Sequence, residues 1–413
     1  MRSALRLVVL AAAVIGPSGS TSFAQVPLPE DLRVAPPGPA VPGSAAGFAG
    51  AWGGGAWDGS VPAALVVESI DADGRASVVI AWGAGGSLLS PPGWQRLAAT
   101  IADGRLTLAT EETIQDYELD RSGGLIGHRQ LAEGWRPEEG WRSYVRLARL
   151  SDQRPAVIAA ELAKPVPRLW QETRIPVVSS LDVAKGERIG LLTTIYRSPL
   201  AGRRPIIILS HGTQDALSSV TRRYEEQARL FLALGFSVAV PMRKGYGGSE
   251  GPLLEASVMP EEVQIGSALE DLHSVVSHLR EDPAIDANRI VLMGADRGGF
   301  LSIAYASRHP NAVAGVVNIS GLWQAEHLND GFNMTEYRQA GRTTRVPTLW
   351  VYARNDTFYP IRSLRADFAG FKAAGGTGRL VELDGPGIDG HALFSWIDAW
   401  REVVADELKR FVN

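Results

Sequence analysis

The hydrophobic pattern of the first part of the chain is short and strand-like. Between residues 48 and 150, apolar residues fall in β-branched or alternating runs separated by turns such as Asp73-Gly74 and Asp103-Gly104. Runs of this kind, bounded by turn residues, predict a small antiparallel β domain. The strands expected in it include residues 63–70, 77–82, 105–109 and 141–150.

From residue 188 to residue 413 the pattern changes. Continuous apolar runs, typical of strands covered on both faces, alternate with segments whose apolar residues recur every three or four positions, as in amphipathic helices. This alternation predicts an α/β domain with a mostly parallel sheet and helices on both faces. The expected strands are residues 189–196, 205–210, 236–240, 289–293, 314–319, 348–352 and 379–383, and the expected helices are residues 224–234, 263–279, 299–308 and 396–411.

Three further segments lie outside these two domains. Residues 1–24 combine early arginines, an apolar stretch at 7–15 and a small-x-small triplet ending at Ala24, the layout of a secretory signal peptide. We expect cleavage after Ala24, a periplasmic or secreted chain and no stable membrane insertion, because a spanning helix needs roughly 20 apolar residues. Proline-rich residues 25–47 predict an extended, mobile tether. Residues 151–187 are expected to form a linker and the entry to the second domain.

Composition narrows the functional classes. The chain has 413 residues, a formal charge of −4, 45% hydrophobic and 21% charged residues, which fits a globular protein of two or three domains. A nucleic-acid partner is not expected without a basic excess. The absence of cysteine excludes disulfides and a cysteine nucleophile. His273, His278, His309 and His327 lack metal-ligand spacing, so we expect neither a metal nor a cofactor.

Tryptophan is concentrated in the β domain. Clustered indoles can form a flat platform for a sugar or an apolar ligand. Filling the core of a small barrel is the simpler interpretation, and we favour it. The tryptophans concerned are Trp52, Trp57, Trp82, Trp94, Trp135 and Trp141.

Polar residues with catalytic chemistry follow the expected strands of the α/β domain. Asp296 is the central residue of Gly294-Ala295-Asp296-Arg297-Gly298, the glycine spacing of a sharp strand-to-helix turn that exposes a nucleophile. Asp356 and His391 follow later strands, which gives the order nucleophile, acid, histidine. Because carboxyl ends of parallel strands share one edge of a sheet, we expect these three side chains to meet there.

Together these residues resemble the α/β-hydrolase superfamily over residues 188–413. The loop at residues 243–249 is similar to the R-G-x-G-x-S turn of that superfamily. The Asn-Asp-x-x-x-Pro run ending at Pro360 and the Asp-Gly-His run ending at His391 look most like dienelactone hydrolases and prolyl-oligopeptidase-related esterases. In that group the resemblance implies serine at the position of Asp296.

The resemblance also implies an oxyanion hole. Its donors would be the backbone N–H groups of Thr213, in the Ser210-His211-Gly212-Thr213 loop, and of Arg297. We expect His211 to have a structural role in supporting that loop.

Aspartate at position 296 leaves three interpretations open. In the first, the chain hydrolyses ester-like or peptide-like bonds of a small-molecule or short-chain substrate through a triad of Asp296, Asp356 and His391. In the second, Asp296 attacks an alkyl carbon as in dehalogenases and epoxide hydrolases, with Trp323 and Tyr337 available for a leaving group. In the third, the chain is an inactive homologue that binds a ligand.

Overall fold

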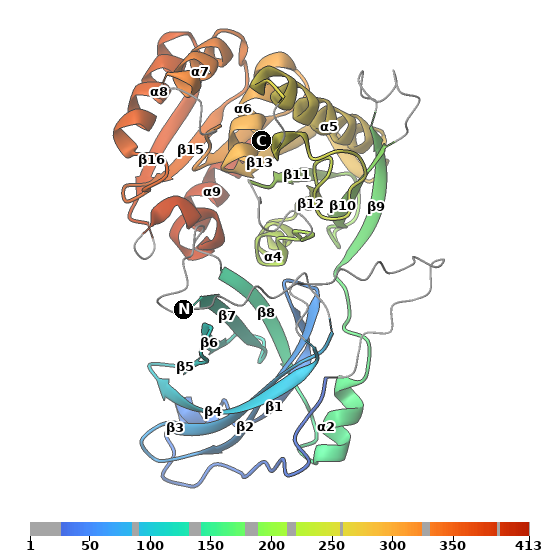
Figure 1. Ribbon diagram of the computed structural model, residues 1–413, viewed down its shortest axis with the longest axis vertical. Coiled ribbons are helices and arrows are strands. Elements are labelled where there is room, and N and C mark those ends of the chain that lie inside the picture. Colours follow the sequence, from blue (N-terminus) through green and yellow to red (C-terminus); the bar gives the residue numbers. More distant parts are fainter. Residues whose placement is uncertain are drawn as a thin grey trace, which may run out of the picture.

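The computed structural model describes residues 26–84, 91–131, 142–177, 189–212, 220–256, 259–323, 331–385 and 389–412. The predicted signal peptide and the predicted oxyanion residue Thr213 lie outside the described residues. Figure 1 shows a β-barrel at one end of the molecule and an α/β domain at the other, with helices α4 and α9 of the α/β domain on the side that faces the barrel.

Among the described residues, eight antiparallel strands close into a barrel in sequence order. Its interior is filled by apolar side chains, among them Trp52 and Trp57, which are 1% and 4% exposed. These two tryptophans therefore have the core role expected of them, whereas Trp94 is 40% exposed. The strands are β1 (Gly50–Trp57), β2 (Val61–Ile70), β3 (Arg75–Trp82), β4 (Gly93–Ala102), β5 (Arg105–Ala109), β6 (Thr113–Leu119), β7 (Leu125–Leu131) and β8 (Arg142–Arg149).

The proline-rich segment before the barrel differs from the expected mobile tether. Val26 and Leu32 are 3% and 2% exposed, and they pack on the outer barrel face at Val66. The short helix α1 (Gly43–Ala46) ends this segment, and α2 (Pro155–Leu162) covers the same outer face from the other side. The physical reason is that this face of β1, β2 and β3 is apolar and needs cover from water.

The α/β domain is built on an eight-stranded sheet in the order β16-β15-β14-β13-β11-β12-β10-β9, within the described residues. The strands from β11 to β16 are parallel, and β10 runs antiparallel to both neighbours. Their bounds are β9 (Trp170–Val177), β10 (Ile189–Tyr196), β11 (Arg204–Ser210), β12 (Ser237–Pro241), β13 (Ile285–Ala295), β14 (Gly315–Ile319), β15 (Thr348–Ala353) and β16 (Gly378–Leu383).

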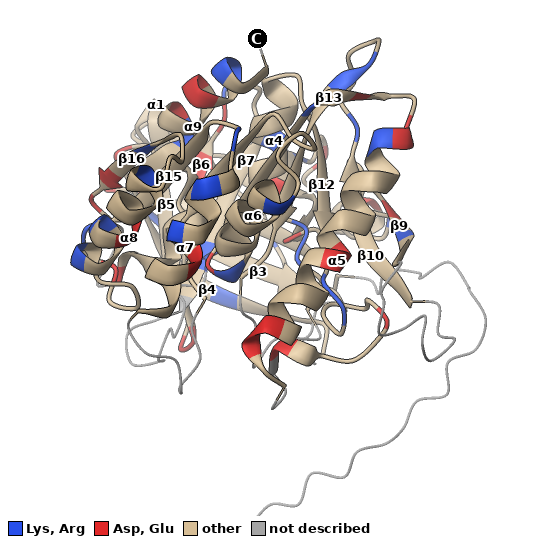
Figure 2. Cartoon of the chain, turned by 90° about the horizontal axis from the view of Figure 1, so that it is seen from above, with Lys and Arg blue, Asp and Glu red and all other residues tan. Residues whose placement is uncertain are grey.

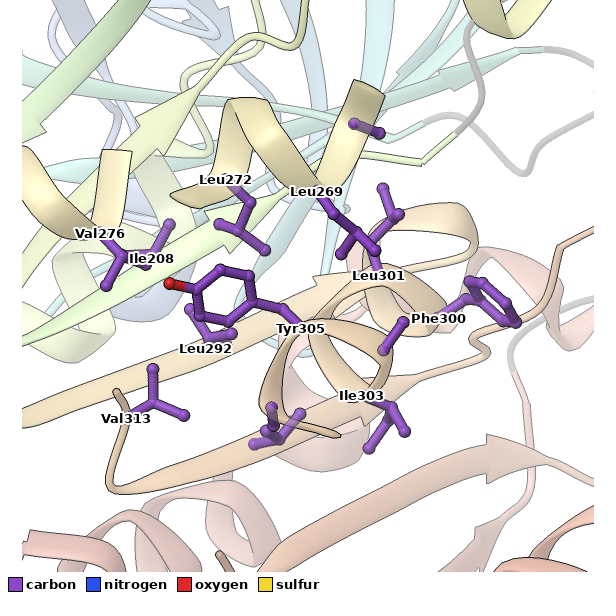
Figure 3. Packing of buried hydrophobic residues seen from close by; sticks show 14 of the residues in the cluster. Ile208, Leu269, Leu272, Val276, Leu292, Phe300, Leu301, Ile303, Tyr305 and Val313 are labelled. Atoms are coloured by element: carbon purple, nitrogen blue, oxygen red, sulfur yellow. The ribbon is translucent and has the colours of Figure 1, made fainter. Parts of the chain in front are cut away.

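Helices cover both faces of this sheet, as Figure 1 shows. One face packs against α5, α6, α7 and α8, and the other against α4 and α9. Figure 3 shows α6 beside α5 on this face of the sheet, with Leu301 and Tyr305 pointing into the shared core. Burial of a side chain such as Leu301 stabilises the fold by about 2 kcal/mol. The helices are α4 (Glu225–Ala233), α5 (Glu261–Glu281), α6 (Arg297–Arg308), α7 (Phe332–Thr343), α8 (Ile361–Ala373) and α9 (Ile397–Val412).

The sheet begins before residue 188, where the α/β domain was expected to start. β9 lies inside residues 151–187, where prolines indicated a linker, and it contains Pro176. Proline is tolerated there because β9 is the edge strand, so one side of its backbone has no partner strand among the residues that the structure describes. Helices α7 and α8 were also not among the expected elements.

Charged residues of both signs are mixed on the surface, as expected for a chain with a formal charge of only −4. In Figure 2, basic and acidic residues are interspersed over the helices on the side shown. None of the helices in the described ranges has the length and apolar character needed to span a membrane.

Candidate active site

Asp296 lies at the sharp turn between β13 and α6, which we call the elbow. Its backbone angles, φ 50° and ψ −128°, are rare for a residue with a side chain. The flanking glycines make the turn possible. A Cβ atom on Gly294 would lie 2.3 Å from the carbonyl carbon of Gly298, and one on Gly298 would lie 2.2 Å from the carbonyl oxygen of Ser210. The glycine spacing thus has a steric origin.

His391 and Asp356 meet at the same edge of the sheet. Nδ1 of His391 lies 3.2 Å and 3.1 Å from the two carboxylate oxygens of Asp356. One of those oxygens also accepts the backbone N–H groups of Phe358 and Tyr359, which fixes the carboxylate. The Asp356 side chain is fully buried and that of His391 is 10% exposed. Since a carboxylate only accepts, Nδ1 donates, and Nε2 is the ring nitrogen left for proton transfer.

Three carboxylates set the proton affinity of His391. Burial alone would lower its pKa, but the hydrogen bond to Asp356 and the charges of Asp296, Asp356 and Asp389 outweigh burial and raise the pKa to about 9. Asp389 also accepts the backbone N–H of His391 at 3.0 Å, as the cap of the 3-10 helix η3 (Gly390–Ser395). His391 is therefore protonated at neutral pH and interacts electrostatically with the elbow carboxylate.

His211 lies fully buried at the end of β11, beside the elbow. Its Nε2 accepts the backbone N–H of Arg243 at 3.0 Å, so Nδ1 carries the proton and donates to the carbonyl of Gly212 at 2.8 Å. Burial and the charge of Arg243 hold the pKa of His211 well below its usual value. The residue is a neutral support for its loop, in line with the structural role expected from the sequence.

Arg297 is the first residue of α6 and directly follows Asp296. Its side chain is buried. The guanidinium lies 4.7 Å from the ring centroid of Trp323 and 3.4 Å from a carboxylate oxygen of Glu255. The side chain is thereby turned into the protein.

The two residues considered for a leaving group are part of the core. Trp323 is 0% exposed and Tyr337 is 1% exposed, and both pack against Phe300. The hydroxyl of Tyr337 donates to the carbonyl of Gly321 at 2.8 Å. Packing rather than leaving-group recognition accounts for both side chains.

The barrel contacts the α/β domain at α4 and at the residue after η3. Nε2 of His128, on β7, lies 2.8 Å from a carboxylate oxygen of Glu226 in the first turn of α4. The guanidinium of Arg142, on β8, lies 4.5 Å from the ring centroid of Trp396, the residue that follows η3. The barrel is thus attached close to the loop that carries His391.

Three residues of this region were not predicted. Asp389 could have been found from its position two residues before His391, which is typical of a turn cap. Phe358, two residues after Asp356, is 48% exposed and stacks on the His391 ring at 5.0 Å. Glu255 lies in a short 3-10 turn and has no sequence signal, because its partners come from other loops.

Two other features of the described residues lie apart from this arrangement. No three histidine, aspartate or glutamate side chains in the described ranges are grouped closely enough to hold a metal ion. A cavity of about 280 Å³ between α6 and α7 is lined by residues such as Ile303 and Glu336, and neither Asp296 nor His391 contributes to it.

Comparison with known proteins bears on the α/β domain. Residues 201–351 match the family model described as serine aminopeptidase, S33. The chain is 30% identical to human monoglyceride lipase over 127 residues, which cover 31% of this chain and 38% of the lipase. It is 23% identical to the acylamino-acid-releasing enzyme of Sus scrofa over 213 residues, which cover 49% of this chain and 28% of that enzyme.

Among solved structures, the acylaminoacyl peptidase of Pyrococcus horikoshii is 13% identical and has a TM-score of 0.44, over 86% of this chain and 62% of that chain. The chain thus matches less than two fifths of the length of the two curated relatives above. Residues 201–351 are thus similar to this hydrolase family, and the strand order and the elbow of the structure are those of an α/β-hydrolase fold.

Proposed function

We propose that this chain hydrolyses ester-like or peptide-like bonds, with Asp296 as nucleophile, His391 as proton donor and acceptor, and Asp356 as the residue that orients His391. One observation carries the proposal: the hydrogen-bonded pair of His391 and Asp356 interacts with a carboxylate held at a strained elbow. The match to hydrolases supports the same class of reaction.

The strain at Asp296 supports a functional interpretation. A residue with a side chain in this backbone region costs about 1–3 kcal/mol, and such strain is concentrated at active sites. Glycine would relieve it, yet the position holds a carboxylate. An elbow that only joined a strand to a helix would have no use for that residue.

The protonation of His391 fits a carboxylate nucleophile. Asp296 needs no base to attack, since it is already an anion. As its oxygen bonds to the acyl carbon, the bond from that carbon to the leaving group breaks, and Nε2 of protonated His391 gives its proton to the leaving alcohol or amine. The products of this step are a mixed anhydride on Asp296, a neutral His391 and the released alcohol or amine.

The anhydride also changes His391. Asp296 is now uncharged, so one of the contributions that raise the pKa of His391 is lost. Neutral Nε2 can then take a proton from water while the water oxygen attacks the acyl carbon. Cleavage of the anhydride releases the carboxylic acid and restores Asp296 as a carboxylate and His391 as an imidazolium.

The test is hydrolysis of short and medium p-nitrophenyl esters by the native protein, Asp296→Ser, His391→Ala and the control His309→Ala. We expect turnover by the native protein that falls by about 100-fold or more in His391→Ala and is kept in His309→Ala. The rate should also decline as pH rises through about 9, because His391 then loses its proton.

A silent native protein combined with an active Asp296→Ser variant would contradict the proposal. That result would indicate an esterase scaffold whose nucleophile was replaced. The electrostatic interaction between His391 and Asp296 would then serve ligand binding, as in the third interpretation of the sequence.

A further inference from the structure

A single buried carboxylate connects two loops of the proposed active site. Glu255 lies on the 3-10 helix η2 (Leu254–Ala256), and its side chain is 5% exposed. Its oxygens accept from Nε and Nη2 of Arg243, the latter at 3.0 Å, and one of them lies 3.4 Å from Nη1 of Arg297. Burial alone would raise the pKa of Glu255, but the two guanidinium groups hold it below its usual value, so the carboxylate is charged.

The other edge of the Arg243 guanidinium faces the loop after β11. Nη1 donates to the carbonyl of His211, and Nη2 donates to the carbonyl of Gly212 at 3.2 Å. A guanidinium is a rigid planar fork, so its attachment to Glu255 determines where these donors point. These two bonds hold the backbone carbonyls of His211 and Gly212, the last described residues of this loop.

The contacts of Glu255 with Arg243 and with Arg297 both lead to the surroundings of Asp296. A Cβ atom on Gly212 would lie 2.9 Å from Cβ and Oδ2 of Asp296, so the loop and the elbow carboxylate are packed against each other. On the other side, Arg297 is the residue after Asp296, and its Nη1 donates to the backbone carbonyl of Glu255 at 3.2 Å. Displacement of either guanidinium would therefore change the surroundings of the nucleophile.

We propose that Glu255 is a positioning residue for this hydrolysis: through Arg243 it orients the loop at Gly212, and through Arg297 it holds the first turn of the elbow helix. The proposal rests on the proposed function. Because Glu255 is buried behind both arginines, it acts through them and not on the substrate. Its loss should lower kcat and leave KM nearly unchanged, since substrate can still bind at a misaligned site.

The variants are Glu255→Gln, which keeps the shape but removes the charge, and Arg243→Lys, which keeps the charge but removes the planar fork. The matched control is Asp271→Asn. Asp271 is a neighbouring carboxylate of equal burial that accepts the backbone N–H of Lys244 at 2.8 Å and lies 3.5 Å from its Nζ. Asp271→Asn therefore measures the effect of neutralising a buried carboxylate that contacts Lys244 instead of the two arginines.

Two readouts are compared, ester hydrolysis and amide hydrogen exchange over residues 204–212 and 297–300. We expect Glu255→Gln and Arg243→Lys to lower kcat by about 100-fold with KM changed by less than about threefold, as a misplacement of about 1 Å would do. Exchange in both peptides should become faster, and Glu255→Asp should restore part of kcat. Asp271→Asn should leave both readouts close to those of the native protein.

Unchanged kcat in Glu255→Gln, or a loss of activity through KM with native exchange in both peptides, would overturn the proposal. If the native protein hydrolyses no ester, the proposed function fails, and exchange alone decides whether Glu255 holds the two loops. If Glu255→Gln does not fold, Arg243→Lys is subjected to the same two measurements and the same criteria.

Discussion

Two histidines at the carboxyl edge of the sheet, His211 fully buried and His391 with a side chain only 10% exposed, have opposite electrostatic surroundings. His391 is flanked by the carboxylates of Asp356, Asp389 and Asp296, which raise its pKa to about 9 in spite of burial. His211 is buried beside the guanidinium of Arg243, and burial together with that charge lowers its pKa well below its usual value. One ring is thus charged at neutral pH and the other is not.

The comparison shows that burial does not by itself determine the protonation of a histidine. Both rings lose solvent, which favours the neutral form. The two rings differ in the sign of the nearest fixed charges. Negative neighbours keep His391 protonated, so that it can donate a proton. A positive neighbour keeps His211 neutral, so that one ring nitrogen donates and the other accepts. The proposed catalytic histidine and the supporting histidine are distinguished by their neighbours.

Of the changes proposed here, replacement of Asp356 should have the largest effect on the difference between His391 and His211. Asp356→Asn removes the charged acceptor that orients His391. The ring then has less negative charge around it, as His211 does. We expect kcat for p-nitrophenyl esters to fall by about 1,000-fold or more, as when the acid of a triad is replaced by its amide. The control is Asp367→Asn, since Asp367 is a similarly buried carboxylate that binds the hydroxyl of Tyr359. Equal loss in both variants would mean that Asp356 only maintains the fold.

The two histidines should make the stability of the protein depend on pH in opposite directions. The folded pKa of His391 lies above its unfolded value of about 6.5, so its contribution of at most about 3 kcal/mol is complete below that pH and is lost as pH rises through about 9. The folded pKa of His211 lies below 6.5, so its contribution is present above that pH and is lost on acidification.

We therefore expect the thermal midpoint of the native protein to decline on the alkaline side between about pH 7 and pH 9.5. His391→Asn should flatten that decline, whereas His211→Asn should flatten the acidic side. A native curve with the same alkaline slope as His391→Asn would show that the three carboxylates do not raise the pKa of His391 in solution.

The sequence predicted the strands that carry the chemistry, because buried parallel strands have continuous apolar runs and their ends share an edge. Asp296, Asp356 and His391 could be found from glycine spacing and chain order, and the structure brings them into one electrostatic group. Their catalytic roles stay predictions.

Other parts could not be predicted, and each has a physical reason. Edge strand β9 contains Pro176, which indicated a linker, because an edge position tolerates a missing N–H. Glu255 binds Arg243, from a loop after β12, and Arg297, from the start of α6, so no local pattern marks it. The segment at Val26 is held by an apolar barrel face that only the folded strands create.

A smaller effect is expected from the aromatic ring beside His391. Phe358 is 48% exposed and its ring lies 5.0 Å from that of His391 at an interplanar angle of 27°. A face of this kind favours the charged imidazolium by about 0.5–1 kcal/mol. Phe358→Ala should therefore move the alkaline limb of the activity profile down by about half a pH unit.

Phe358→Ala should also raise KM for esters with apolar acyl groups by about threefold, since an exposed phenyl ring at the site offers apolar contact. Phe358→Tyr, which keeps the ring, is the control. An alkaline limb unchanged in Phe358→Ala would mean that the carboxylates alone determine the charge of His391, and the contrast with His211 would then be purely one of fixed charges.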